Sequence, residues 1–111
     1  MAPRLQRTLS PIDGSVAVTR ELADAAALER VLDAAQRAQS GWQTTALDER
    51  RQVVRRMVDA IVANADAIGQ ELALQMGRPV RDGPKEIRGG FAERALAMAD
   101  LAPAALAAGA R

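Results

Sequence analysis

The titratable side chains of this 111-residue chain are confined to carboxylates, arginines and a single lysine, Lys85. Histidine, cysteine and tyrosine are absent, so no side chain has an ordinary pKa between those of the carboxylates and those of lysine and arginine. General acid–base chemistry would fall to a carboxylate or to Lys85. A serine nucleophile would have no imidazole to activate it, and metal sites of the cysteine and histidine kind are impossible.

The glycines lack the spacing of a phosphate-binding loop. None of the eight forms GxG, and no GxxxxGK[ST] motif is present, so neither a dinucleotide fingerprint nor a phosphate loop is expected. The serines Ser10, Ser15 and Ser40 are interpreted as turn and cap residues. We therefore predict no catalytic, cofactor-binding or metal-ligating residue, and no turnover by this chain alone.

Length and composition allow one small domain or a piece of a larger one. Hydrophobic residues make up 49% of the chain, but many are alanine and the aromatics are limited to Trp42 and Phe91. A core built from these residues is thin, so we expect marginal stability and a partner surface.

The charge pattern argues against nucleic acid as a partner. The formal net charge is +1, and acidic and basic residues are interspersed along the chain. Arginine in place of lysine, together with abundant alanine, indicates GC-rich coding and a bacterial source. No apolar run approaches the roughly 20 residues of a membrane span, and no signal peptide is evident, so we expect a cytoplasmic protein.

The first elements are a β-hairpin over residues 7–20 and a helix over 24–40. An Asp13-Gly14 turn before alternating valines predicts the hairpin, which needs a sheet or partner because two strands alone are barely stable. Asp24 begins the helix and Ser40-Gly41 ends it. Trp42 then follows, and we expect its ring to fold back into the core.

A second helix is predicted over residues 46–63, with Thr45 and Asp48 as a capping box. Arg50 lies inside its apolar arc. Two interpretations stay open: the guanidinium hydrogen-bonds Glu71 or Glu86 of a later helix, or it reaches water from the first turn.

The third and fourth helices are predicted over residues 64–76 and 83–102. Asn64 can cap the third, which ends at Gly77-Arg78-Pro79, and Pro84 stands near the first position of the fourth.

Gly89-Gly90 weakens the centre of the fourth helix. The pair indicates close helix packing, or alternatively RNA contact as an RGG fragment. The tail over 103–111 is alanine-rich and has no partner strand.

The order of these features resembles the N-terminal region of the aldehyde dehydrogenase superfamily. That region has an N-P-x-x-G-like turn, a helix ending near tryptophan, an E-R-x-x-[IL]-L helix start and an E-x-x-x-x-x-G-[KR]-P close. The likeness covers roughly residues 8–102. The residues that carry it are Ser10-Pro11, Gly14, Trp42, Glu49-Arg50, Val53-Val54, Glu71, Gly77-Arg78-Pro79 and Glu86.

The resemblance implies a parent enzyme in which a cysteine thiolate attacks an aldehyde, hydride passes to NAD or NADP, and a glutamate activates water. None of these catalytic residues matches a position here. The resemblance further implies a mostly α segment, residues 1–111, of an incomplete α/β coenzyme-binding domain. Its expected partners are the remainder of the enzyme or a homo-oligomer partner, met through the hairpin and the apolar helix faces.

A free-standing helical interaction module is the alternative, because the same apolar stripes could form a bundle or dock a partner. The hairpin and the alanine-rich tail argue against it. A small enzyme in its own right is disfavoured because the chain lacks the necessary side-chain chemistry.

Overall fold

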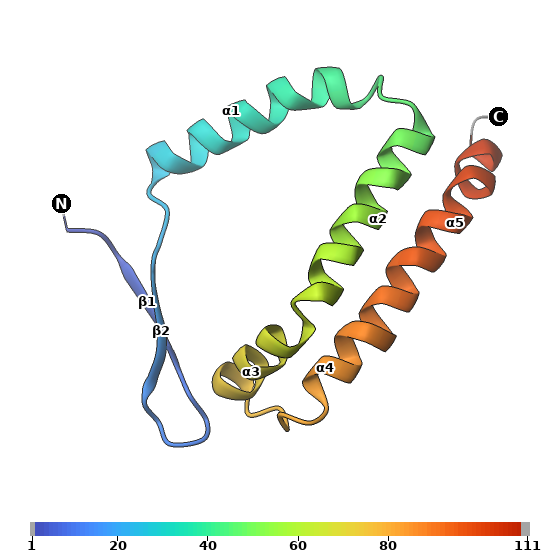
Figure 1. Ribbon diagram of the computed structural model, residues 1–111. Helices are drawn as coiled ribbons and strands as arrows, with labels where there is room; N and C mark the ends of the chain where they lie inside the picture. The colour runs from blue at the N-terminus through green and yellow to red at the C-terminus, as the bar shows by residue number, and fades with distance from the viewer. Residues whose placement is uncertain (1, 110–111) are drawn as a thin grey trace.

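The computed structural model describes residues 2–109 as a mostly helical chain that begins with an antiparallel β-hairpin (Figure 1). This confirms the predicted fold class. The elements are β1 (Leu5–Leu9), β2 (Val16–Glu21), α1 (Ala25–Trp42), α2 (Leu47–Ala63), α3 (Ala65–Met76), α4 (Gly83–Lys85), the π-helical turn η1 (Glu86–Phe91) and α5 (Ala92–Ala108).

Hydrogen bonds within the loop close the hairpin. The Ser10 N–H donates to the Ser15 carbonyl oxygen at 2.8 Å, and Gly14 has a φ of 74°, which glycine adopts without a Cβ clash. The Asp13 carboxylate accepts hydrogen bonds from the hydroxyl and the backbone N–H of Ser15. These bonds, the hydroxyl first, lower the pKa of Asp13 below its ordinary value. The turn is where it was predicted, and the strands extend beyond 7–20 at both ends.

The loop of the hairpin packs on the end of α3. Ser10 is 2% exposed. Pro11 lies so close to Gly77 that a Cβ on that glycine would come within 3.0 Å of the Pro11 Cγ. From β2, the Arg20 guanidinium donates to the side-chain oxygen of Gln75 at 3.1 Å. The hairpin is therefore attached to the helices through its loop and through β2.

The first helix begins as predicted and ends later. The Asp24 carboxylate accepts from the backbone N–H of Ala27 at 2.7 Å and caps α1. The predicted end at Ser40-Gly41 is wrong, because α1 continues through Gly41 and includes Trp42. An isolated glycine costs a helix about 1 kcal/mol, which is too little to stop it.

The predicted side-chain caps of α2 and α3 do not form. The Thr45 hydroxyl donates to the Gly41 carbonyl oxygen at 3.3 Å, and Ala46 begins α2 without a side-chain cap. The Asn64 amide donates to the Ala60 carbonyl oxygen at 2.8 Å, and α3 has no side-chain cap either. In both places the polar side chain satisfies the end of the preceding helix instead of the start of the next one.

The chain reverses between α3 and α4 through a close contact of two glycines. As predicted, α3 ends at Gly77, whose φ of 71° is left-handed. A Cβ on Gly83 would lie 2.6 Å from the Cα of Gly69, and a Cβ on Gly69 would lie 2.6 Å from the Cδ of Pro84. Both glycines are buried. Neither position can carry a side chain unless the two helices separate.

The Gly89-Gly90 pair makes no such contact. A Cβ on either glycine would meet no atom within 4 Å, so the predicted close packing is wrong for the described part of the chain. The pair lies in η1, where the Ala92 N–H bonds the Ile87 carbonyl oxygen, five residues earlier. Glycine has a low α-helix propensity, so we attribute the wider π turn to this pair.

The last helix runs past its predicted end at residue 102. α5 continues to Ala108 with Pro103 inside it, so most of the predicted tail is helical. Residues 110 and 111 of that tail lie outside the described residues. Proline has no N–H, so Pro103 leaves the carbonyl of Ala99 without its helical donor. The surrounding alanines favour the helix most strongly of all residues and carry it past the proline.

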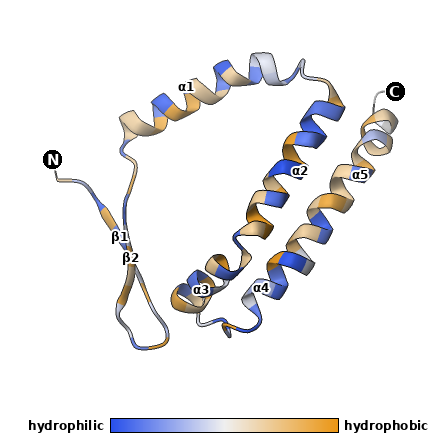
Figure 2. Cartoon of the chain, viewed as in Figure 1, coloured by the Kyte–Doolittle hydropathy of each residue, from blue (hydrophilic) through white to orange (hydrophobic). Residues whose placement is uncertain are grey.

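The core is small and consists of small side chains. α1 buries no residue, and Leu28, Val31 and Leu32 on it are more than half exposed. Figure 2 shows hydrophobic residues recurring along α1 and over most of α5. The buried apolar residues are Val58, Ala65, Ala73, Ala92 and Ala99.

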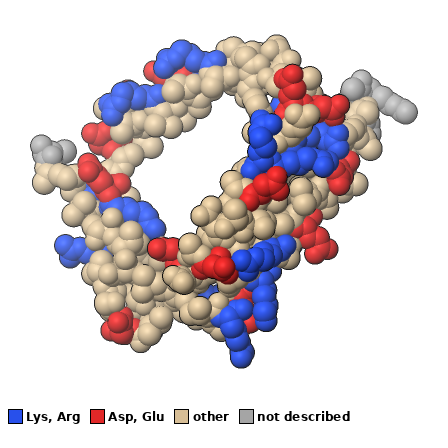
Figure 3. All heavy atoms as spheres, viewed as in Figure 1, with Lys and Arg blue, Asp and Glu red and all other residues tan. Residues whose placement is uncertain are grey.

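The chain is much more extended than a compact domain of the same size. Its accessible surface is 8584 Å², whereas a compact monomer of this mass exposes about 5,900 Å². The radius of gyration is 18.6 Å, against about 13 Å for a compact domain of this length. Figure 3 shows an opening through the molecule, bounded by α1, the hairpin, and α2 with α3. The fold is therefore an open layer without a closed core.

Replacing Gly69 with alanine should destabilise this layer, even though alanine favours a helix. The propensity gain is about 1 kcal/mol, whereas overpacking against the rigid ring of Pro84 costs about 1–3 kcal/mol. Gly89→Ala is the matched control, because its Cβ meets no atom within 4 Å, and it should stabilise by up to about 1 kcal/mol. Helical circular dichroism followed in urea gives both values. A gain in both variants would contradict the close contact.

Candidate functional site

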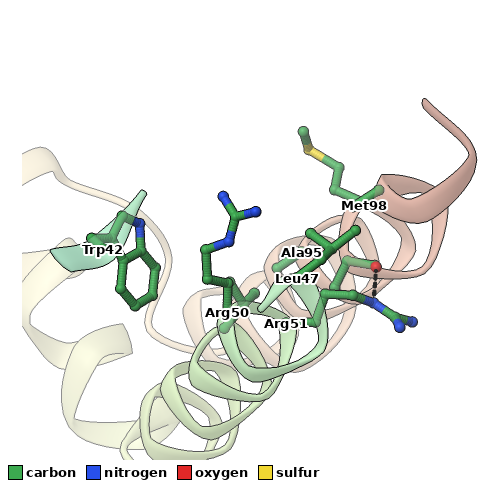
Figure 4. Close-up of a pocket in the computed structure, with 9 residues that line it drawn as sticks. Trp42, Leu47, Arg50, Arg51, Ala95 and Met98 are labelled. Atoms are coloured by element: carbon green, nitrogen blue, oxygen red, sulfur yellow. Dashed lines mark hydrogen bonds between the residues drawn. The ribbon is translucent and has the colours of Figure 1, made fainter. Parts of the chain in front are cut away.

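A groove lies between the N-terminal half of α2 and residues 95–102 of α5 (Figure 4). It has a volume of about 440 Å³ and opens to solvent. The lining is apolar apart from two arginines and consists of Trp42, Leu47, Arg50, Arg51, Val54, Ala95, Met98, Ala99 and Ala102.

Residue spacing explains why these side chains meet. The α2 wall is an i, i+3, i+4, i+7 stripe that begins at Leu47, and the α5 wall contains alanines at i, i+4 and i+7, beginning at Ala95. These alanines are too small to fill the space opposite the α2 stripe. Trp42, at the end of α1, closes one side. The result is a groove instead of a packed seam.

Arg51 joins the two walls. Its Nε donates to the carbonyl oxygen of Ala99 at 2.7 Å, and this is the carbonyl that Pro103 leaves without a helical donor. The guanidinium also pairs with Asp48 at 2.8 Å and with Asp100 at 3.6 Å. Arg51 therefore satisfies the carbonyl exposed by the proline and is itself neutralised. Sequence reasoning missed this contact. The proline indicates a free carbonyl on Ala99 but not which side chain reaches it.

Arg50 has no comparable partner among residues 2–109. Its Nε is buried and makes no hydrogen bond, while its terminal nitrogens remain open to solvent. In Figure 4 its side chain lies between Trp42 on one side and Ala95 and Met98 on the other, whereas Arg51 points away from it. A cation held among apolar side chains without a counter-ion is unfavourable.

The predicted hydrogen bond from Arg50 to Glu71 or Glu86 is wrong. Glu86 pairs with Arg78, and Glu71 accepts a hydrogen bond from Gln75 at 2.6 Å. Arg50 lies in the first turn of α2, about 20 Å along the axis from the end at which α3 begins. A helical wheel gives the direction of a side chain but not its position along the helix. The exposed terminal nitrogens agree with the other interpretation, in which the guanidinium reaches water.

Trp42 is not the core residue that was predicted. It is the last residue of α1, and it is 42% exposed. Its ring cannot fold back on a buried stripe, because α1 buries no residue. The ring instead forms one side of the groove. A large, half-exposed apolar ring beside a half-buried arginine is typical of a binding surface.

Some of the other charged residues form ion pairs on the surface. Arg55 pairs with Asp100, and Arg88 pairs with Asp66 at 3.1 Å. These side chains are largely exposed, so each pair contributes about 0–1 kcal/mol.

The described residues hold no cluster of three or more histidines, cysteines or carboxylates that could bind a metal ion. No helix within residues 2–109 is long and apolar enough to cross a membrane. The groove brings together apolar surface and a cation, which suits docking.

Comparison with known proteins shows sequence relatives. A sequence model described as the aldehyde dehydrogenase family matches residues 2–107. An aldehyde dehydrogenase of Deinococcus radiodurans is 32% identical over 73 residues, which cover 66% of this chain and 14% of that protein. Probable aldehyde dehydrogenases of Mycobacterium tuberculosis and Streptomyces coelicolor are 34% identical over 73 residues and 33% over 75, with the same coverage. No solved structure matches the chain.

The fold and the groove define a mainly helical, open layer that begins with a hairpin. The chain belongs to the aldehyde dehydrogenase family, as its resemblance indicated. The matched region spans 14% of the length of these relatives.

Replacing Arg50 with methionine should stabilise the chain. Methionine keeps an apolar stem and removes an N–H that is buried without a partner, a defect that costs about 1–3 kcal/mol. Because only the Nε of Arg50 is buried without a partner, we expect a gain near the lower end, about 1 kcal/mol. Arg56→Met, at an exposed position of the same helix, is the control and should change stability by about 0.5 kcal/mol or less. Urea midpoints from circular dichroism test this. A loss in Arg50→Met alone would mean that Arg50 is already paired.

Replacing Pro103 with alanine should make Arg51 less important. Alanine is favoured over proline inside a helix by about 3 kcal/mol, and it returns a donor to the Ala99 carbonyl. Arg51→Met should destabilise the unchanged chain by about 1–2 kcal/mol, because it leaves that carbonyl without a donor and removes the partner of Asp48. The loss should be smaller by about 0.5–1.5 kcal/mol in the Pro103→Ala background. Equal losses in both backgrounds would contradict the compensation.

Proposed function

We propose that this chain is the N-terminal structural segment of an NAD(P)-dependent aldehyde dehydrogenase and is catalytically inactive by itself. Family membership supports the parent activity, the oxidation of an aldehyde to a carboxylic acid with NAD or NADP. The chain contains no cysteine, histidine or tyrosine, so it lacks the thiolate that the parent chemistry needs. We assign the parent enzyme to a bacterium, because the relatives reported above are bacterial, and we propose that it is cytoplasmic.

The open fold is the observation that carries this proposal. The chain exposes about 2,700 Å² more than a compact monomer of its mass, an excess comparable to what one partner buries in a large obligate interface. The exposed surface includes the apolar side chains of α1, among them Val31 and Leu32. We infer that these faces pack against the remainder of the enzyme.

The hairpin is the second packing surface. Its strands pair with each other, and among the described residues no further strand extends the sheet. Leu5 and Leu9 on β1 are more than half exposed. A two-stranded ribbon is barely stable alone, and its free edges can accept another strand. We infer that the hairpin joins a sheet of the remaining enzyme or of a second subunit.

A free-standing helical interaction module remains the alternative. The groove between α2 and α5 favours it, because such a module would use an apolar groove to dock a partner. The two functions differ in the free state. A free-standing module would be a compact monomer, whereas a structural segment exposes the faces that the enzyme covers.

The purified chain should give no aldehyde-dependent formation of NADH or NADPH. Absorbance at the wavelength of the reduced coenzyme should equal that of a protein-free control over a panel of aliphatic and aromatic aldehydes. The full-length Deinococcus radiodurans relative, assayed in parallel, is the positive control. Turnover above background by this chain would overturn the proposed inactivity, since no residue here can replace the thiolate.

A further inference from the structure

We propose that the groove between α2 and α5 receives an acidic, otherwise apolar polypeptide segment whose carboxylate pairs with Arg50. The proposal rests on the proposed function, because we assign the segment to the remainder of the aldehyde dehydrogenase. The matched region spans 14% of the Deinococcus radiodurans relative, and under the proposed function the covering segment comes from the part of such an enzyme that this chain does not match.

The charge balance of the groove selects a carboxylate. Arg51 is neutralised by Asp48 and Asp100, and Arg55 also pairs with Asp100. None of the residues that line the groove is acidic. Arg50 is therefore the cation of the lining that lacks a counter-ion within the described chain. A carboxylate bound to its terminal nitrogens would supply that counter-ion.

The rest of the groove lining is apolar, so we expect the residues that flank the carboxylate in the bound segment to be apolar as well. Leu47, Val54 and the α5 alanines offer no side-chain donor or acceptor. Trp42 and Met98 are 42% and 73% exposed, so both can still be covered. Tryptophan and arginine dominate binding energy where they are buried together at an interface. An acidic side chain flanked by leucine-like residues fits both features.

The chain's own acids do not fill the groove. Glu71 and Glu86 are engaged at the opposite end of α2. A second copy of the chain is another source, because α1 carries acids beside an exposed apolar stripe. The covering segment of the longer polypeptide is favoured, since such a segment is linked to the groove and needs no second molecule.

The test uses the 111-residue chain labelled with ¹⁵N. The probes are two short peptides with blocked ends. One carries a single glutamate between leucines, and the other carries glutamine in its place. The readout is the indole N–H signal of Trp42, the sole tryptophan, which lines the groove. The glutamate peptide should shift this signal saturably and bind about tenfold or more tightly than the glutamine peptide.

Arg50→Met should abolish the preference for glutamate, and Arg56→Met should preserve it. Circular dichroism confirms that both variants keep their helices. Equal binding of the two peptides to the unchanged chain, or no shift with either at millimolar concentration, would overturn the proposal. So would a glutamate preference that survives Arg50→Met. Self-association that Arg50→Met abolishes would reassign the groove to a second copy. The proposed function stands or falls separately on the aldehyde assay.

Discussion

The backbones of α3 and α4 touch at Gly69 and Gly83, and the position of every later element follows from this contact. A side chain at either position would force the two helices apart, because its Cβ would lie 2.6 Å from atoms of the other helix. With hydrogen at both positions, the chain turns sharply enough for α5 to run back along α2 (Figure 1). Without the reversal there would be no groove.

The small residues that allow this tight reversal also leave the core thin. Alanine and glycine let helices approach closely but bury little apolar area, and area buried is what stabilises a fold. Val58 is the one large side chain among the buried apolar residues of the described chain. Local compensation helps, as when Arg51 supplies the donor that Pro103 lacks. The larger apolar side chains stay on the surface, and this exposure supports the proposal that another surface covers them.

Local signals predicted the elements well. Gly77 with Pro79 predicted the end of α3, and Asp24 predicted the start of α1, because both act through backbone geometry within a few residues. Where two helices compete for one polar residue, the signal was ambiguous: Thr45 and Asn64 bond backward to the helix before them. Alanine propensity carried α5 past Pro103, which a proline rule alone does not anticipate.

Long-range contacts could not be predicted from one chain. The Gly89-Gly90 pair attracted the packing prediction, yet the contact is made by Gly69 and Gly83, which are separated in sequence and look unremarkable. The prediction that Arg50 lies on an apolar face of α2 was correct, but the predicted partner was wrong. A helical wheel gives the direction of a side chain and not its position along the helix axis. Trp42 was expected in a core that this segment does not complete. Each of these three errors concerns which residues contact a given side chain, and those contacts depend on the tertiary structure.

The central claim is that the apolar face of α1 packs against a surface outside this chain. Hydrogen exchange of the isolated chain tests this claim most directly. Amides of residues 25–42 should exchange at nearly the rates of an unfolded peptide, because α1 buries no residue. Amides of α2 and α3 around Val58, Ala65 and Ala73 should exchange much more slowly. Equal protection of α1 and of these residues, at a concentration where the chain is monomeric, would contradict the account and show that the chain closes its own core.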